Sequence, residues 1–189
     1  MKKIIFDLDD TLYKSKELRD MREKAILDFL GNRASEYSEL RETHGTIAAL
    51  EVLGISKKQF YEIIDKIPIN LDRDEKLINM LEELKRNHLI IIISNNSRNS
   101  IKEVIKKLGI GNFIDSYFGG DDFKAIKPKK EVFSIVEKED ICIGNNFKKD
   151  LEIPKKKGAI TILISDKEDN EADFTVPVVY DIKKIIDAL

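Results

Sequence analysis

Polar residues follow three of the apolar runs in this sequence, at points where buried strands would end. A single carboxylate after a strand is usually a turn residue or a helix cap, but several polar groups in a fixed order are hard to obtain by chance. In parallel sheets, ligands gather at the carboxyl ends of the strands. The residues that could handle a phosphate there are Asp7, Asp9, Ser94, Asn95, Asn96, Lys127, Asn145, Asn146 and Asp150.

The elements that must position these residues are short apolar runs alternating with helical patterns. Runs at 4–6, 89–94, 141–144 and 160–164, with a weaker one at 117–118, predict strands. Between them lie segments with helical spacing, and Gly109 is a plausible end for one of these helices. This alternation predicts an α/β fold with right-handed crossovers, a Rossmann-like doubly wound parallel sheet with helices on both faces.

The interval from 14 to 71 breaks the alternation, because it has no strand-like run. Helical periodicity is present at 18–30, 47–53 and 60–64. We therefore expect an inserted helical domain at 14–71, and a core domain made of 1–13 and 72–189. The return link predicts Asp72 or Asp74 as the cap of the next helix.

Composition excludes several classes of protein. The 33 Lys and Arg residues nearly balance the 35 Asp and Glu residues, for a net charge of -2, which argues against binding to nucleic acid or an anionic membrane. Cys142, the single cysteine, lies in an apolar run and is expected to be a buried thiol. The sequence has neither a signal peptide pattern nor an apolar stretch near the ~20 residues that span a bilayer, so we expect a cytoplasmic protein.

Four motifs resemble those of the haloacid-dehalogenase-like hydrolases, and they extend over residues 6 to 150. The first motif is the most specific, and the others gain weight from their order and spacing. They read Asp7-Leu8-Asp9-Asp10-Thr11-Leu12-Tyr13, Ile93-Ser94-Asn95-Asn96, Ile126-Lys127-Pro128 and Ile143-Gly144-Asn145-Asn146-Phe147-Lys148-Lys149-Asp150.

The resemblance implies a role for each of these positions in phosphoryl transfer. Asp7 would attack phosphorus and form an aspartyl-phosphate, while Asp9 would protonate the leaving oxygen and later take a proton from water. An acid at the position of Asp9 indicates phosphoryl chemistry, since the dehalogenases of the family need no leaving-group acid. The residues expected to bind the phosphate or balance its charge are Thr11, Ser94, Asn95 and Lys127.

The resemblance also implies Mg²⁺, held by Asp7, the backbone carbonyl of Asp9, Asn145 and Asp150. Asn145 departs from the family, which usually has Asp at this position. Its amide oxygen can still coordinate a metal, with one negative charge fewer. Asp150 could instead become a direct ligand, or the site could be degenerate and bind without turnover.

The helical insertion resembles the C1 cap of the family, a small lid that covers the active site. The segment Arg41-Glu42-Thr43-His44-Gly45-Thr46 and the Tyr13 that closes the first motif are similar to pyrimidine 5'-nucleotidase-like members. Arg41 and His44 are therefore candidates for substrate contacts, although a lone histidine on such a helix is more often a surface residue.

Together these features predict a Mg²⁺-dependent phosphatase acting on a small phosphorylated metabolite, such as a nucleotide or a sugar phosphate. A phosphomutase with the same nucleophile is an alternative. A catalytically silent binding or regulatory protein is another, because of Asn145. We expect a monomer or a homodimer.

Overall fold

The computed structural model describes all 189 residues and divides them into two compact units. The larger unit contains Met1–Lys14 and Leu71–Leu189, and the smaller contains Ser15–Asn70. These boundaries lie within one residue of those expected from the sequence. Of the residues singled out above for chemistry, all except Arg41 and His44 belong to the larger unit.

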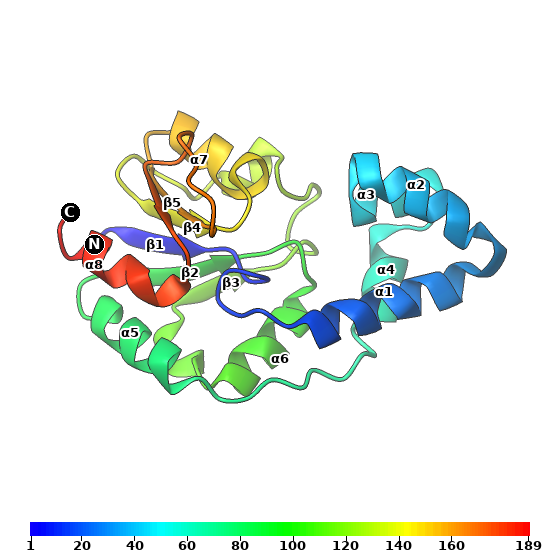
Figure 1. Ribbon diagram of the computed structural model, residues 1–189, viewed down its shortest axis with the longest axis horizontal. Helices are drawn as coiled ribbons and strands as arrows, with labels where there is room; N and C mark the ends of the chain where they lie inside the picture. The colour runs from blue at the N-terminus through cyan, green and yellow to red at the C-terminus, as the bar shows by residue number, and fades with distance from the viewer. The chain divides into compact units, whose positions relative to one another are not determined.

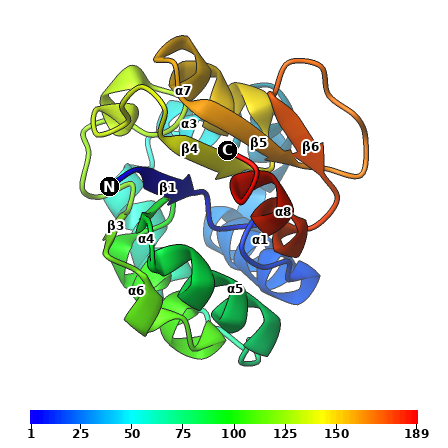
Figure 2. The same cartoon turned by 90° about the vertical axis from the view of Figure 1, so that its left-hand side faces the viewer.

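Six parallel strands form the sheet of the larger unit, in the order β3-β2-β1-β4-β5-β6 (Figures 1 and 2). The chain runs outward from β1 in both directions, which confirms the doubly wound α/β fold. The strands are β1 Lys3–Phe6, β2 Leu89–Ile93, β3 Ser116–Phe118, β4 Ile141–Gly144, β5 Ile160–Ile164 and β6 Phe174–Val176.

Helices cover both faces of this sheet (Figure 1). The helices α5 (Glu75–Lys85), α6 (Arg98–Leu108) and α8 (Ile182–Ile186) lie on one face. On the other face lie α7 (Glu152–Lys156) and the 3₁₀ turn η3 (Lys130–Phe133). Because both faces are covered, the buried positions of β1, β2 and β4 are continuously apolar instead of alternating with polar residues.

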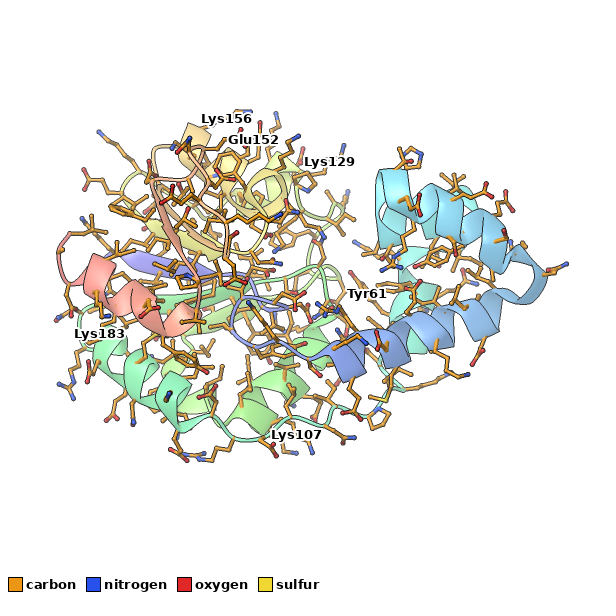
Figure 3. All side chains as sticks on the ribbon, in the orientation of Figure 1. Tyr61, Lys107, Lys129, Glu152, Lys156 and Lys183 are labelled. Carbon is orange, nitrogen blue, oxygen red and sulfur yellow. The ribbon has the colours of Figure 1, made fainter.

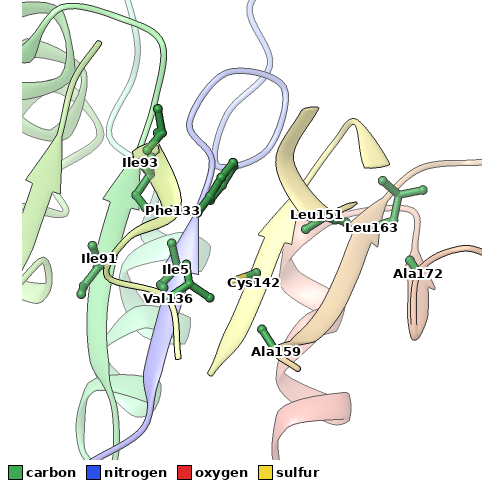
Figure 4. Close-up of a cluster of buried hydrophobic side chains, with 11 residues drawn as sticks. Ile5, Ile91, Ile93, Phe133, Val136, Cys142, Leu151, Ala159, Leu163 and Ala172 are labelled. Atoms are coloured by element: carbon green, nitrogen blue, oxygen red, sulfur yellow. The ribbon is translucent and has the colours of Figure 1, made fainter. Parts of the chain in front are cut away.

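The core between the sheet and η3 is a cluster of aliphatic side chains (Figure 4). Ile5, Ile91 and Cys142 point from three adjacent strands toward Phe133 and Val136. Cys142 is 3% exposed, which confirms the predicted buried thiol, and burial raises the pKa of that thiol well above its ordinary value. The cluster lies directly beneath the residues that follow β1 and β4.

The smaller unit is entirely helical, as expected. Its elements are α1 (Lys16–Leu30), the 3₁₀ turn η1 (Gly31–Arg33), α2 (Ala34–His44), α3 (Thr46–Val52) and α4 (Lys57–Ile64). Ser15 caps α1 by accepting a hydrogen bond from the N–H of Leu18, and Ser56 forms a capping box with Gln59 at α4. Periodicity did not predict α2, because Tyr37 is its only buried residue.

Exposed charges on the helices pair along the sequence. Lys156 and Glu152 lie side by side on α7, with Nζ 2.5 Å from Oε1 (Figure 3). Lys183 makes the same i,i+4 contact with Asp187 on α8. Exposed pairs of this kind contribute little to stability. No helix of the chain is both long enough and apolar enough to cross a membrane.

Asp74 resolves the ambiguity about where α5 begins. Its Oδ1 accepts a hydrogen bond from the N–H of Leu77 at 2.9 Å, so Asp74 is the cap and Asp72 is not. The Tyr180 hydroxyl donates to Oδ2 of Asp74 at 2.6 Å. Burial, together with this bond to a carboxylate, raises the pKa of Tyr180 to about 12.

We expect Asp74→Ala to lower the free energy of unfolding by about 1 to 2 kcal/mol, because it removes the cap and the acceptor of the Tyr180 hydroxyl. Urea denaturation followed by circular dichroism measures the change. Asp72→Ala, at an exposed position two residues earlier, is the control and should change it by less than about 0.5 kcal/mol. Equal losses in the two variants would contradict the cap at Asp74.

Candidate active site

A pocket of about 150 Å³ opens beside the residues that follow β1, β2 and β4. Carboxyl ends of parallel strands meet at one edge of a sheet, so groups far apart in the sequence converge there. Most of the residues expected from the sequence are among those that line the pocket. These are Asp7, Asp9, Ser94, Asn95, Lys127, Asn145 and Asp150, and the lining also includes Asp10 and Lys149.

A buried lysine joins two carboxylates at the floor of this pocket. The Nζ atom of Lys127 donates to Oδ1 of Asp7 and, at 2.7 Å, to Oδ1 of Asp150. The side chains of Lys127 and Asp150 are only 3% and 4% exposed. Burial alone would lower the pKa of Lys127, but the charges of Asp150 and Asp7 outweigh it and hold that pKa above its ordinary value. Lys127 is therefore a permanent cation at the pocket.

Asn95 fixes the backbone of Lys127. The N–H of Lys127 donates to Oδ1 of Asn95 at 2.8 Å, and Nδ2 of Asn95 donates to the Lys127 carbonyl at 3.3 Å. The sequence predicted a phosphate contact for Asn95 but gave no sign of this second role. A side-chain amide that pairs with a main chain 32 residues away leaves no local sequence pattern.

Asp150 reaches the pocket floor from a single π-helical turn, η4 (Phe147–Leu151). Its Oδ2 accepts the N–H of Asn146 at 3.1 Å, which leaves Oδ1 for Lys127. A Cβ atom on Gly144 would lie 2.4 Å from the Cβ of Asp150. Only glycine at the end of β4 therefore allows this carboxylate so close to the strand.

Thr11 has a different position from the one expected. The sequence predicted that it binds the phosphate, but its hydroxyl donates to Oδ2 of Asp7 at 3.0 Å, and the residue is 3% exposed. The backbone turn after β1 folds Thr11 back under Asp7, since the N–H of Leu12 bonds to the carbonyl of Leu8. Thr11 thus supports Asp7 directly, and its contact with a phosphate stays a prediction.

Three further residues near the pocket were given no individual role from the sequence, although Asn96 was counted among the polar residues that could handle a phosphate. Tyr13 and Asn96 donate to the two carboxylate oxygens of Asp9. Lys149 lines the pocket beside Asn145 and Asp150. Lys149 could have been suspected from its place in the fourth motif, but Asn96 carried only the signal of an ordinary strand-to-helix turn.

Oxygen donors are present at the pocket, among them the carboxylates of four aspartates. No group of three or more His, Cys, Asp or Glu side chains is arranged to hold a metal ion. Asn145, which is exposed, lines the same pocket as these aspartates. The remaining donors are oxygens only, which is the set that Mg²⁺ prefers, with waters completing its coordination.

Arg41 and His44 lie at the end of α2 in the helical unit. Arg41 pairs with Glu23 of α1, with Nη1 2.7 Å from Oε1, and nearly half of its side chain is exposed. His44 is exposed. Both Arg41 and His44 therefore lie on a helix, as expected. A substrate contact for either residue stays a prediction.

The family is shown by the sequence itself. Residues 4–142 match the family described as haloacid dehalogenase-like hydrolase, and the chain belongs to it. Its fold and the residues gathered at the pocket agree with membership of this superfamily of enzymes. No curated protein gives a significant sequence match.

Solved structures with the same fold differ in chemistry. A HAD phosphatase from Thermococcus onnurineus is 20% identical with a TM-score of 0.71, and 98% of each chain is covered. A Bacillus subtilis protein described as a HAD-hydrolase and bound to magnesium is 13% identical, with a TM-score of 0.67 and 98% of each chain covered. L-2-haloacid dehalogenase from Xanthobacter autotrophicus is 15% identical, with a TM-score of 0.65 and coverage of 100% and 99%. At such identities the likeness establishes the fold alone.

Replacing the buried lysine tests how far the pocket depends on its charge. We expect Lys127→Met to lower the free energy of unfolding by about 3 to 5 kcal/mol at neutral pH, because it leaves the buried Asp150 facing Asp7 without a cation. Chemical denaturation of chelator-treated protein measures this. Lys155→Met is the control: it removes an ion pair to Asp173 in which both side chains are more than a third exposed, and should cost less than about 1 kcal/mol.

The cost of Lys127→Met should also depend on pH. Burial and the neighbouring Asp7 raise the pKa of Asp150, against the opposing effect of Lys127. Without the lysine, this pKa rises further above its unfolded value, so the folded variant binds a proton more readily than the unfolded chain. Its stability deficit should therefore shrink as the pH falls from 8 to 5. A deficit that is independent of pH would show that charge is not its cause.

Proposed function

We propose that this chain is a Mg²⁺-dependent phosphatase that hydrolyses a small phosphomonoester, such as a nucleotide or sugar phosphate, through an aspartyl-phosphate on Asp7. The observation that carries the proposal is the presence of Asp9 in the same pocket as Asp7, Ser94 and Lys127. A second carboxylate there serves proton transfer to a leaving alkoxide. A dehalogenase expels a halide, which needs no proton.

In the first half-reaction a carboxylate oxygen of Asp7 attacks phosphorus, and the bond from phosphorus to the leaving oxygen breaks. Asp9 gives its proton to that oxygen, so a neutral alcohol departs. Lys127 and the Ser94 hydroxyl offset the charge of the phosphoryl oxygens. Thr11, which donates to Oδ2 of Asp7, holds the nucleophile in place.

In the second half-reaction water attacks the phosphorus of the aspartyl-phosphate. Asp9, now a carboxylate, accepts a proton from the water, and the bond between phosphorus and Asp7 breaks. Inorganic phosphate leaves, and both aspartates return to their starting states. The first half-reaction needs an acid and the second needs a base. The Asp9 carboxyl group supplies both in turn, because it is left as a carboxylate after it gives up its proton.

Mg²⁺ would be held by Asp7, the backbone carbonyl of Asp9 and the amide oxygen of Asn145. When bound, it would neutralise negative charge on the phosphoryl oxygens. Asp150 is already engaged by Lys127 and the N–H of Asn146, which favours a supporting role for it. The magnesium bound to the Bacillus subtilis relative of the same fold is consistent with this choice of metal.

We further infer that the helical unit, residues 15–70, acts as the lid of this site and contributes substrate selectivity. The support is its insertion between the first and second motifs, in the position of the family's C1 cap. Rates on a panel of phosphomonoesters, compared between the whole chain and a chain in which a short linker replaces the unit, test this role.

The test of the function is phosphate release from a panel of nucleotides and sugar phosphates with the metal varied. Release of inorganic phosphate supports the phosphatase. Isomerised sugar phosphate without release would instead identify a phosphomutase. A folded, Mg²⁺-supplemented protein that releases nothing would support a silent binding protein.

Asp7 and Asp9 should differ in how their loss depends on the leaving group. Asp7→Asn should abolish turnover of every substrate. Asp9→Asn should lose ~10²- to 10⁴-fold in rate with an alkyl phosphate, because the leaving alkoxide needs a proton. With p-nitrophenyl phosphate the loss should be much smaller, since nitrophenolate departs unaided. Equal defects on the two substrates would remove the acid role from Asp9.

Asn145 should make metal binding weak, because the site has one carboxylate fewer. We expect Asn145→Asp to lower the dissociation constant for Mg²⁺ by about 5- to 30-fold, which corresponds to ~1 to 2 kcal/mol. Calorimetric titration of the apo protein with Mg²⁺ measures this without relying on activity. An unchanged constant would place Asn145 away from the metal.

A further inference from the structure

Both oxygens of the Asp9 carboxyl group are held by hydrogen bonds from side chains. The Tyr13 hydroxyl donates to Oδ1, and Nδ2 of Asn96 donates to Oδ2, each at 2.5 Å. The two donors come from different parts of the chain, the turn after β1 and the loop after β2. Together they hold the carboxyl group in one orientation in this structure.

The turn after β1 brings Tyr13 back to Asp9. The chain reverses through Asp10, whose φ of 59° lies in the left-handed region, and the N–H of Leu12 bonds to the carbonyl of Leu8. Asp9 and Tyr13 then lie side by side as an isolated parallel bridge. The tyrosine therefore faces Asp9 because of the fold of the first motif itself.

Asn96 connects Asp9 to the phosphate-binding serine. Its backbone N–H donates to the Oγ of Ser94 at 3.1 Å, and its carbonyl accepts the N–H of Gly120 at 2.7 Å. The residue is 9% exposed, so these bonds are largely shielded from water. Since Oγ of Ser94 already accepts the Asn96 N–H, its own proton is free to point toward a phosphoryl oxygen.

We propose that Tyr13 and Asn96 are positioning residues that orient the Asp9 carboxyl group for proton transfer, an inference that rests on the proposed function. The two donors differ chemically. An amide nitrogen only donates, so Oδ2 stays without a proton, whereas a hydroxyl can donate or accept. The transferable proton therefore belongs on Oδ1, where the Tyr13 oxygen can accept it until the leaving oxygen arrives.

This arrangement explains why two 2.5 Å bonds converge on one carboxyl group at the edge of an open pocket. A general acid must be within hydrogen-bond reach of the leaving oxygen and correctly oriented, and a freely rotating group would seldom be so. Through Asn96, the orientation of the acid is tied to that of Ser94. The phosphate and the proton donor are thus aligned by one residue.

The main test is Tyr13→Phe, which removes the hydroxyl and keeps the ring. We expect kcat on glycerol phosphate to fall about 10-fold, with KM unchanged and less than about 2-fold change on p-nitrophenyl phosphate. In an Asp9→Asn background the same substitution should have no further effect, because the group that it positions no longer carries a proton. Asn96→Ala should behave alike, since the backbone bonds of Asn96 do not need its side chain.

Tyr180→Phe is the matched control. It also removes a tyrosine hydroxyl that donates to an aspartate, here Asp74 at 2.6 Å, at a position that does not line the pocket. It should leave kcat on both substrates unchanged. The control shows whether losing any tyrosine–aspartate hydrogen bond lowers kcat, or only losing the one between Tyr13 and Asp9.

Equal losses of Tyr13→Phe on the two substrates, or a further loss in the Asp9→Asn background, would overturn the positioning role. So would unchanged kinetics in both Tyr13→Phe and Asn96→Ala, while the wild type remains active and Asp9→Asn keeps its dependence on the leaving group. In these cases the proposed function stands without the inference. A wild type that releases no phosphate from these two substrates or from any nucleotide or sugar phosphate of the panel would overturn the function and the inference together.

Discussion

The buried cation of Lys127 is the constraint on which the rest of the site depends. Two carboxylates, Asp7 and Asp150, converge at the floor of the pocket from the ends of two adjacent strands, and Asp150 is 4% exposed. Without a cation between them, two carboxylates would repel each other in a site with little water. The ammonium group of Lys127 offsets this repulsion and contacts both carboxyl groups directly. Asn95 makes two hydrogen bonds to the backbone of Lys127, and Lys127 in turn contacts Asp7. Asn95 therefore affects the proposed nucleophile indirectly, through the position of Lys127.

The order of the strands in the sheet brings Asp7 and Asp150 close enough to share Lys127. Because β1 lies between β2 and β4 in a parallel sheet, the residues that follow these three strands meet at one edge. Ile5, Ile91 and Cys142 pack beneath them against Phe133, so the strand ends rest on a rigid core. Asp150 lies so close to Gly144 that any side chain at position 144 would collide with it, so this carboxylate packs directly on the end of β4.

Sequence patterns predicted those parts of the molecule that depend on local order. The apolar runs predicted β1, β2, β4 and β5, because strands covered on both faces have a continuous apolar signal. The edge strand β6 was not predicted, since it is only three residues long and Phe174 is exposed. The helix α2 was likewise missed, because helical periodicity requires more than the one buried side chain that Tyr37 provides.

The same limit explains what sequence reasoning missed at the site. Asp7, Asp9, Ser94 and Lys127 were found through motif order, and the structure brings them to one pocket. The true partner of Thr11, by contrast, depends on how tightly the turn after β1 closes, which its residue types do not determine. The contacts of Asn95 and Asn96 join residues 32 and 87 positions apart, respectively, and no one-dimensional pattern encodes such pairs.

Asn145 is best understood through the total charge of the pocket. Four aspartates and two lysines line it, and an aspartate at 145 would add a fifth carboxyl group. In the proposed reaction the pocket must attract a divalent cation and also a phosphate dianion, and each added carboxylate helps the first while opposing the second. Lys149, next to Asp150 in the chain, shifts the balance in the same direction as Asn145. Compared with a pocket that has aspartate at position 145, this pocket therefore repels a phosphate dianion less and attracts a divalent cation less, so we expect weak metal binding.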